Sequence, residues 1–417
     1  MKRESFGSRL GFILVSAGCA IGIGNVWKFP YICGAYGGAA FILIYLCFLV
    51  ILGIPVLVAE FAVGRGSHTS VAKCFDKLAP AGSGWKPLKF IGIIGCYMLM
   101  MFYTTVGGWM IYYCVKSLRG DFVGATPEAV TQSFSDMLGN APTMMLWMVI
   151  ICLIGFAVCF MGLQNGIEKI SKVMMSALLI IMVILAVHSV MMEGAGEGIS
   201  FYLIPDFQKI KEAGVGNVVF AALSQSFFTL SIGIGAMLIF GSYLDKSRSL
   251  TGEAVSITVL DTFVALTAGF IIIPACFSYG IQPDAGPSLI FITLPNIFAK
   301  MSGGALWGSL FFLFLTFAAV STIIAVFENL IVFNMELFGW NRKKSVVVCA
   351  VLVMILSIPC VLGFNVLSGF QHSEMEATSW IWKTLLFLII FFLLEVLVTF
   401  CFVPERTDGD GTISLQR

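Results

Sequence analysis

Long apolar segments, each sufficient to cross a lipid bilayer, constrain this chain more than any other feature of its sequence. A transmembrane helix needs about 20 consecutive, mostly apolar residues. Candidate segments of this kind lie at 10–32, 38–62, 88–116, 143–162, 167–192, 217–243, 252–280, 305–336, 345–364 and 380–403. They predict an all-α polytopic membrane protein of about 10 transmembrane helices, folded as a single transmembrane domain over residues 1–417.

The composition supports a membrane environment and excludes several classes of function. Of the 417 residues, 59% are apolar and 11% are charged, whereas soluble proteins carry about 25% charged residues. A soluble fold could not keep so much apolar surface away from water, which excludes soluble enzymes and nucleic-acid-binding proteins. The spans contain neither a nucleophile–base pair nor a repeated ring of charges, which argues against an intramembrane enzyme and against a channel.

Basic residues predict the orientation of the chain in the bilayer. When the spans alternate from a cytoplasmic N-terminus, most of the 24 Lys and Arg residues fall on the cytoplasmic side, as the positive-inside rule requires. The longer and more acidic segments near 117–142, 193–216 and 281–304 then lie outside. We therefore expect a cytoplasmic N-terminus.

Two of the spans contain polar residues and glycines at their centres. The first span carries Gly22, Gly24 and Asn25 in its middle, and the sixth reads SQSFFTLSIGIG over 224–235. Glycine weakens a helix by about 1 kcal/mol per residue, and backbone that opens in a membrane must be buried in protein or line a wet cavity. An alternative explanation is that these glycines serve close helix packing.

The two interrupted spans are five spans apart, which predicts an internal repeat. Each would be the first helix of a five-helix unit, at about 8–195 and 215–403. Units with an odd number of helices insert with opposite topology, and inverted repeats with broken first helices place an ion and substrate site at the bilayer midplane.

At these residues the chain resembles the neurotransmitter:sodium symporter family, in its bacterial amino-acid-transporting branch. The resemblance is carried by the stretch from Arg9 to Pro30, by EFAVGR at 60–65, by SFFTLS at 226–231 and by ITLP at 292–295. It covers about residues 1–370. It implies a multi-pass protein of the bacterial inner membrane that imports an amino acid with sodium by alternating access.

The resemblance implies two sodium sites. One is expected to use the Ala20 carbonyl, the side chains of Asn25, Thr229 and Asp261, and the carboxylate of the bound amino acid. The other is expected to use the carbonyls of Gly18, Ile21 and Ala318 and the hydroxyls of Ser321 and Thr322. These two hydroxyls have an alternative role, because Ser and Thr in helices also bond to their own preceding turn.

Asp261 stands where relatives more often have Asn, and an acid inside a span is a functional hypothesis by default. Chloride-dependent relatives use a Tyr, Gln and Ser cluster for the anion. Tyr45 and Gln225 match that cluster, but Ala265 occupies the place of the Ser. We therefore expect Asp261 to supply the negative charge and transport to need no chloride.

The substrate pocket implied by the resemblance combines backbone of the first span with apolar walls. Tyr103 is expected to donate to the substrate carboxylate, and Gly22 stands where amine-transporting relatives carry an Asp. An apolar or aromatic substrate side chain is expected. The complete set is Ala20, Gly22, Gly24, Leu99, Tyr103, Phe228, Thr229, Ser231, Ile234, Thr322 and Val326.

The expected gates lie at the two ends of the molecule. Arg3 and Glu336 resemble the cytoplasmic ion pair of the family, with Tyr243 and Glu328 nearby, and Lys28 takes the place of the outer-gate Arg. The alternative is that these residues are interfacial anchors whose charged ends reach water.

After Gln371 the expected resemblance ends, and the gate acid of the family's tenth helix is absent. We hypothesise a shift of reading frame between Gln371 and Glu374, because codons permitted for 378–402 also encode a family-like helix in another frame.

The sequence leaves two alternatives to sodium symport open. One is a truncated, transport-impaired member that at most binds amino acids, and the other is a proton-coupled transporter that uses Asp261. The sequence leaves the oligomeric state open.

Overall fold

The computed structural model describes residues 5–80, 82–280 and 288–367, and its regular elements in these ranges are all helical. Short π-helical segments carry the label η. The elements of the first half are α1 (Arg9–Ala20), η1 (Gly24–Lys28), α2 (Phe29–Ala35), α3 (Ala39–Phe48), η2 (Leu49–Gly53), α4 (Ile54–Ser67), α5 (Val71–Leu78), α6 (Leu88–Arg119), α7 (Pro127–Gly139), α8 (Ala141–Phe160), η3 (Leu163–Glu168) and α9 (Lys169–Val190).

The elements of the second half follow a similar pattern of long and interrupted helices. They are α10 (Ala195–Leu203), α11 (Phe207–Ala213), α12 (Val215–Thr229), α13 (Ala236–Gly241), α14 (Leu250–Ser278), η4 (Leu289–Thr293), α15 (Leu294–Lys300), α16 (Gly304–Phe338) and α17 (Arg342–Gly363).

Most of the expected spans coincide with these helices. Within the described residues, seven helices are long and apolar enough to cross a membrane, or eight if the bent pair α1 and η1–α2 counts as one span. The expected sixth span is divided between α12 and α13. The expected span at 380–403, the tail after Gln371 and the gate residue Arg3 lie outside the described residues.

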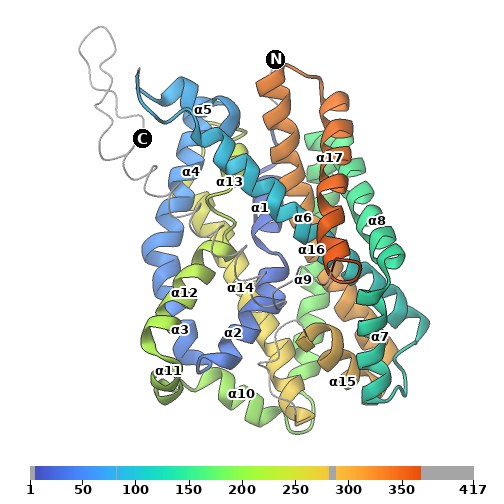
Figure 1. The fold of residues 1–417 in the computed structure, drawn as a ribbon. Helices are drawn as coiled ribbons and strands as arrows, with labels where there is room; N and C mark the ends of the chain where they lie inside the picture. The colour runs from blue at the N-terminus through green and yellow to red at the C-terminus, as the bar shows by residue number, and fades with distance from the viewer. Residues whose placement is uncertain (1–4, 81, 281–287, 368–417) are drawn as a thin grey trace.

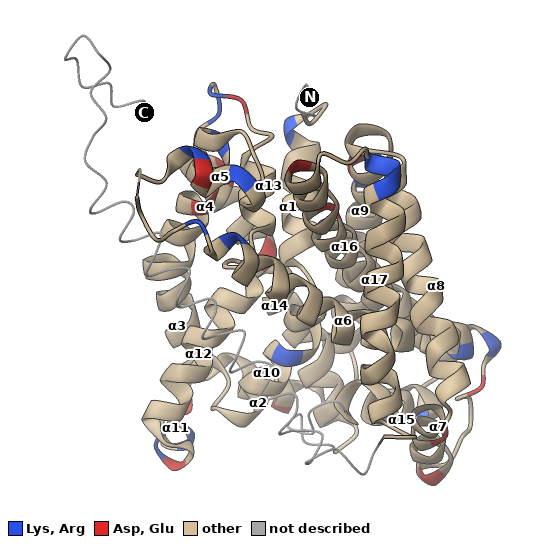
Figure 2. Cartoon of the chain, turned by 45° about the horizontal axis from the view of Figure 1, so that its top comes forward, with Lys and Arg blue, Asp and Glu red and all other residues tan. Residues whose placement is uncertain are grey.

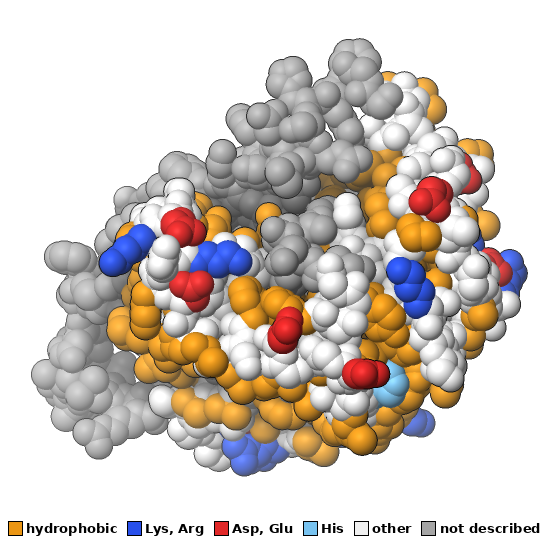
Figure 3. Space-filling view, turned by 90° about the horizontal axis from the view of Figure 1, so that it is seen from below, with side chains coloured by type: hydrophobic (Ala, Val, Ile, Leu, Met, Phe, Trp, Pro, Cys, Tyr) orange, Lys and Arg blue, Asp and Glu red, His pale blue; other side chains and the backbone are white. Residues whose placement is uncertain are grey.

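Side chains on the periphery are apolar, as a lipid environment requires. Ile51, Val259 and Ile355 lie on long helices and remain 67%, 63% and 56% exposed. Figure 2 shows Lys, Arg, Asp and Glu gathered mainly at the two ends of the bundle. Seen from below in Figure 3, charged side chains lie scattered among apolar ones. A helix that is apolar on its outer face and carries its charges at its ends suits a bilayer.

The helix α16 forms the centre of the bundle. In Figure 1, α1, α14 and α16 lie between α3, α4 and α12 on one side and α7, α8 and α17 on the other. Small residues bring neighbouring helices close to this centre. A Cβ atom at Gly107 of α6 would lie 2.5 Å from Ile151, and one at Gly155 of α8 would lie 2.9 Å from Phe327. In a membrane, helices associate through close van der Waals packing rather than through the hydrophobic effect, and small residues allow that close packing.

Both interrupted spans break where the sequence predicts. The first bends by 56° between α1 and the helix that begins at Gly24. The second is open over residues 230–235, where Gly233 and Gly235 have φ values of 89° and 79° and Ser231 has 51°. Left-handed backbone is accessible to Gly at little cost, so Gly233 and Gly235 allow the open conformation between α12 and α13. The two breaks expose backbone polar groups at the centre of the bundle.

Candidate functional site

A buried polar cluster joins the first broken span to the sixth. The Asn25 amide Nδ2 donates to Asp261 Oδ1 at 2.7 Å and to Thr229 Oγ1 at 3.0 Å. The Thr229 hydroxyl donates to Asp261 Oδ2 at 2.7 Å. All three side chains are at most 1% exposed. The structure therefore brings together the three side chains expected at the first sodium site, from η1, α12 and α14.

The second expected group assembles at the carbonyl end of α1. Thr322 Oγ1 lies 3.3 Å from the Gly18 carbonyl oxygen, 3.4 Å from that of Ile21 and 3.3 Å from that of Ala318. Ser321 donates to the Ala318 carbonyl at 3.0 Å. The Thr322 hydroxyl thus lies near the carbonyl of its own preceding turn and also near the carbonyls at the end of α1, so both expected roles of this hydroxyl are geometrically present.

Both groups have the chemistry that suits a hard cation. The candidate ligands are carboxylate, amide, hydroxyl and carbonyl oxygens, which hard cations prefer. Ala20 is the last residue of α1, and the carbonyls of a helix C-terminus carry partial negative charge without helical partners. Open carbonyls of half-helices are the groups that coordinate Na⁺ in transporters with broken helices.

Two glycines of the first span form a tight wall beside these groups. A Cβ atom at Gly22 would lie 2.4 Å from the Tyr103 hydroxyl and 2.8 Å from Thr322 Oγ1. A Cβ atom at Gly24 would lie 2.0 Å from the Phe228 ring. The Tyr103 hydroxyl accepts the Ile23 N–H at 2.9 Å. The side chains expected to orient a substrate therefore touch the open backbone directly.

The other expected pocket residues are buried or half-buried within the helix bundle. Ser231 donates to the Cys19 carbonyl at 2.9 Å, which joins the two breaks. Leu99, Ile234 and Val326 are buried, with exposures of 8%, 7% and 0%. Together with Tyr103 and Phe228 they supply apolar and aromatic surface from α6, α12, α16 and the segment 230–235.

Tyr45 of α3 and Gln225 of α12, the two residues that match the anion cluster of chloride-dependent relatives, are buried. The Tyr45 hydroxyl and both polar atoms of the Gln225 amide are buried without a hydrogen bond in the described part of the chain. Ala265, which is 0% exposed, offers no hydroxyl. The expected replacement of an anion by Asp261 remains a prediction.

At the end where α1 begins, acidic residues make several contacts. Glu328 is fully buried and accepts two hydrogen bonds from Arg342, at 2.7 Å and 2.9 Å, and one from Tyr243 at 3.1 Å. Glu336 accepts the backbone N–H and the hydroxyl of Ser70 at 2.8 Å and 2.7 Å. The expected closeness of Tyr243 to Glu328 is present, whereas the partner expected for Glu336, Arg3, lies outside the described residues.

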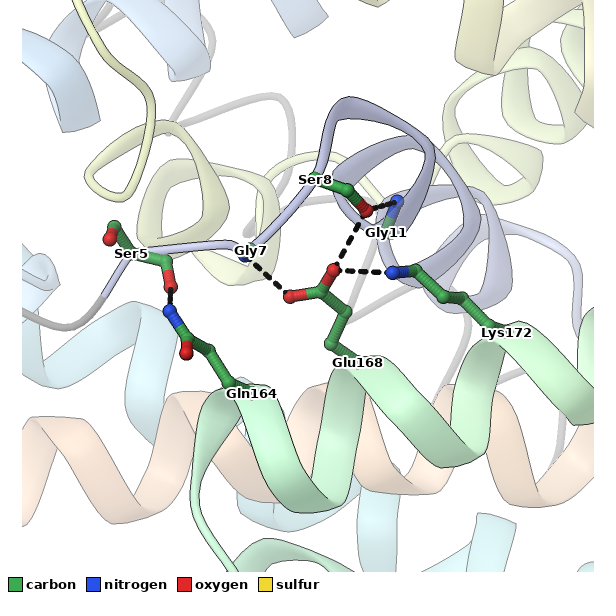
Figure 4. Close-up of polar contacts among 7 residues, drawn as sticks. All are labelled: Ser5, Gly7, Ser8, Gly11, Gln164, Glu168 and Lys172. Carbon is green, nitrogen blue, oxygen red and sulfur yellow. Dashed lines mark hydrogen bonds and ion pairs between the residues drawn. The ribbon is translucent and has the colours of Figure 1, made fainter.

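Glu168 holds the beginning of α1 (Figure 4). Its carboxylate accepts the Gly7 N–H at 2.7 Å, the Ser8 hydroxyl at 2.9 Å and the Lys172 ammonium at 2.7 Å. A Cβ atom at Gly11 would lie 2.0 Å from this carboxylate. The absence of a side chain at Gly11 is thus what lets Glu168 reach α1.

Toward the opposite end, Lys28 lies above the pocket side chain Phe228. Its ammonium is 4.7 Å from the centre of the Phe228 ring, within the range of a cation–π contact. The expected outer-gate residue therefore contacts a residue of the expected pocket.

Sequence reasoning missed several residues of this region. Arg342, Glu168 and Glu60 were given no role in the site. Glu60 opens the family-like motif at 60–65, is fully buried and accepts the Gly233 N–H. A buried acid is costly unless it is hydrogen-bonded, so an isolated Glu within an apolar stretch was the available signal for Glu60. Arg342 lies in a basic run that also suits a membrane boundary.

Comparison with protein families gives one match that spans nearly the whole chain. The model of the sodium:neurotransmitter symporter family matches residues 3–132 and 128–401. The match continues past Gln371, where the resemblance was expected to end. An uncharacterized sodium-dependent transporter, YhdH, of Bacillus subtilis is 35% identical over 88% of this chain and 80% of its own length. One of Haemophilus influenzae is 33% identical over 87% and 81%.

A solved structure supports the same relationship. The structure described as MhsT in complex with L-phenylalanine matches with a TM-score of 0.87 and 34% identity, over 99% of this chain and 94% of the other. The sodium-dependent serotonin transporter of Drosophila melanogaster is a more distant relative, 27% identical over 86% of this chain.

Proposed function

Because the chain belongs to the sodium:neurotransmitter symporter family, a class of membrane transporters rather than enzymes, we propose that it imports an apolar or aromatic amino acid together with sodium. The observation that carries this proposal is the buried cluster of Asn25, Thr229 and Asp261 between the two broken spans. The complex of MhsT with L-phenylalanine supports an amino acid as the substrate.

The first sodium ion would bind at Asn25, Thr229, Asp261 and the Ala20 carbonyl, with the substrate carboxylate beside it. The Asn25 amide would turn its oxygen to this ion. The second would bind at the carbonyls of Gly18, Ile21 and Ala318 and the hydroxyls of Ser321 and Thr322. Sharing a carboxylate between substrate and ion makes each bind more tightly in the presence of the other, which is reciprocal coupling.

The amino acid would lie against the open backbone of the first span. Tyr103 would bind its carboxylate, and its side chain would enter the surface formed by Leu99, Phe228, Ile234 and Val326. Gly22 provides no acid for an isolated amine, so the substrate must bring its own carboxylate. A difference of one methylene in such a pocket is worth about 1–3 kcal/mol, which limits discrimination among apolar side chains.

Transport would proceed by alternating access across two inverted five-helix repeats, with the ions and the substrate bound midway. Lys28 over Phe228 would close the outer path. Glu336, Tyr243 and Glu328 would close the inner path, with Arg342 as an added member. Figure 2 shows Lys and Arg concentrated at the end where the chain begins, which supports a cytoplasmic N-terminus in a bacterial inner membrane.

The alternatives are less well supported. A protein that only binds amino acids, or one coupled to protons through Asp261, has no counterpart among the named sodium-dependent relatives. Asp261 is a buried carboxyl at the centre of the bundle, a position that a proton carrier would also occupy. The experiment must therefore separate coupling to sodium from coupling to protons.

Uptake in proteoliposomes tests the proposal. A labelled panel of apolar, aromatic and charged amino acids is offered with sodium or with choline outside, at fixed membrane potential. Accumulation of apolar or aromatic members only with sodium is expected. The matched variants are Thr229→Val, which removes a candidate ligand oxygen, and Thr105→Val, which removes a buried hydroxyl of α6 that bonds to its own helix. Equal uptake in choline, or uptake driven by a pH gradient alone, would overturn sodium coupling.

A further inference from the structure

The open segment 230–235 of the sixth span has backbone polar groups that its own helices satisfy only in part, through the bonds from Ser231 N–H to the Phe228 carbonyl and from Ile239 N–H to the Gly235 carbonyl. Backbone N–H and C=O groups inside a membrane need partners, because no lipid atom can bond to them. Two further groups find partners on other helices. The Gly233 N–H is bound by Glu60 of α4, and the Ile234 carbonyl is bound from α6 and α16.

The contacts to the Ile234 carbonyl form a closed triangle. The Cys96 thiol lies 3.1 Å from this oxygen, and the Asn329 Nδ2 lies 3.1 Å from the same oxygen. The Asn329 amide also lies 3.4 Å from Cys96 Sγ. A carbonyl oxygen has two lone pairs and an Asn amide has two hydrogens, so all three contacts are satisfied at once. Cys96 and Asn329 are 0% and 1% exposed.

The position of this triangle matters because Ile234 lies between two glycines in left-handed conformations. Gly233 has φ 89° and Gly235 has φ 79°. Glycine gives the backbone more freedom than any other residue, so the peptide groups on both sides of Ile234 can rotate unless they are held. Glu60 holds the Gly233 N–H, one peptide group before those that flank Ile234, and the triangle fixes the Ile234 carbonyl on the C-terminal side.

We propose that Cys96 and Asn329 are positioning residues that fix the Ile234 side chain as one wall of the substrate pocket and so set the length of apolar side chain that is accepted. This inference rests on the proposed function. Neither residue needs to touch the substrate, since each acts on the backbone that carries Ile234. The Cys96 thiol serves as a small hydrogen-bond donor.

This role predicts which substitutions preserve the substrate selectivity and which change it. Cys96→Ser keeps a donor of similar size, whereas Cys96→Ala removes it. Asn329→Leu removes the second donor at nearly constant volume. Cys114→Ala is the matched control, because Cys114 is a buried thiol on the same helix, about 27 Å along its axis at 1.5 Å per residue.

The measurement is the half-saturation concentration for alanine, leucine and phenylalanine in sodium-driven uptake. The ratio of the half-saturation concentrations for phenylalanine and alanine should change about fivefold in Cys96→Ala and in Asn329→Leu, because each variant loses one buried hydrogen bond. It should stay within about twofold in Cys96→Ser and Cys114→Ala, where that bond is kept. Because both donors serve one oxygen, the double variant should change the ratio by less than the product of the single effects.

Three outcomes would overturn the inference. They are a uniform change for all three amino acids, an equal effect of the Ser and Ala variants at Cys96, and an equal effect at Cys114. Hydrogen exchange of the amides in 230–235 gives a readout that needs no transport. Faster exchange is expected in Cys96→Ala and Asn329→Leu only, and unchanged exchange in both refutes the positioning role. Absence of wild-type sodium-driven uptake with the expected exchange pattern would instead reject the proposed function.

Discussion

Replacing Asp261 by Asn isolates the effect of one buried charge at the first candidate sodium site. The shape is preserved, because an Asn carbonyl can still accept from Asn25 and its amide can face the Thr229 oxygen. The wild-type carboxylate lies 2.7 Å from both of these partners. The substitution therefore removes the negative charge with little change in geometry.

The size of the effect follows from the distance between charge and ion. A cation bound by Asn25 and Thr229 would lie within about 4 Å of the carboxylate, where two unit charges interact by about 4 kcal/mol at an effective dielectric constant of 20. The Asn oxygen remains a possible ligand and returns part of this energy. A net loss of about 2–3 kcal/mol corresponds to a rise of roughly 30- to 150-fold in the half-saturating sodium concentration.

The assay is amino-acid uptake as a function of external sodium, with Asp206→Asn as the control. Asp206 is exposed and caps the short helix α11, so its loss should leave sodium dependence unchanged. A half-saturating concentration in Asp261→Asn within about threefold of wild type, less than 1 kcal/mol, would refute the electrostatic reasoning. Loss of proton coupling with unaltered sodium dependence would support the proton-carrier alternative.

Other parts of the structure give three further expectations. Uptake by the unmodified protein should be the same in chloride and in gluconate, because Asp261 supplies the charge; a fall in gluconate would contradict this. Arg342→Gln should lower the free energy of unfolding by about 3–5 kcal/mol, since it leaves buried Glu328 without its ion pair, whereas Lys343→Gln at an exposed position should not. Equal melting temperatures of the two variants would contradict this expectation. Gly11→Ala should speed hydrogen exchange at Gly7 by displacing Glu168, although Ala favours helix by about 1 kcal/mol; Gly252→Ala is the control.

The sequence predicted the helical class and the positions of the breaks, because both are local properties. An apolar run of sufficient length is a helix in a membrane, and Gly233 and Gly235 fall where the open backbone needs positive φ. The grouping of Asn25, Thr229 and Asp261 was expected only from the family resemblance. The structure brings these three side chains together, although their role with sodium is still a prediction.

Contacts between distant helices could not be predicted in the same way. Whether Cys96 meets Ile234, or Arg342 meets Glu328, depends on how α6, α16 and α17 rotate about their axes. Those rotations follow from the packing of many apolar side chains that are nearly interchangeable in the sequence. A buried thiol in an apolar run cannot be told from a packing residue in the sequence, and only its neighbours in space reveal a hydrogen bond.

The tight fit of Gly22 against its neighbours limits how this protein can evolve. A side chain at this position would meet the Tyr103 hydroxyl and Thr322 Oγ1, so an acid introduced there requires these side chains to move. Tyr103 is the residue proposed to bind the substrate carboxylate, so such an acid would also disturb that proposed contact. Directed evolution toward amines should start from libraries that vary positions 22 and 103 together.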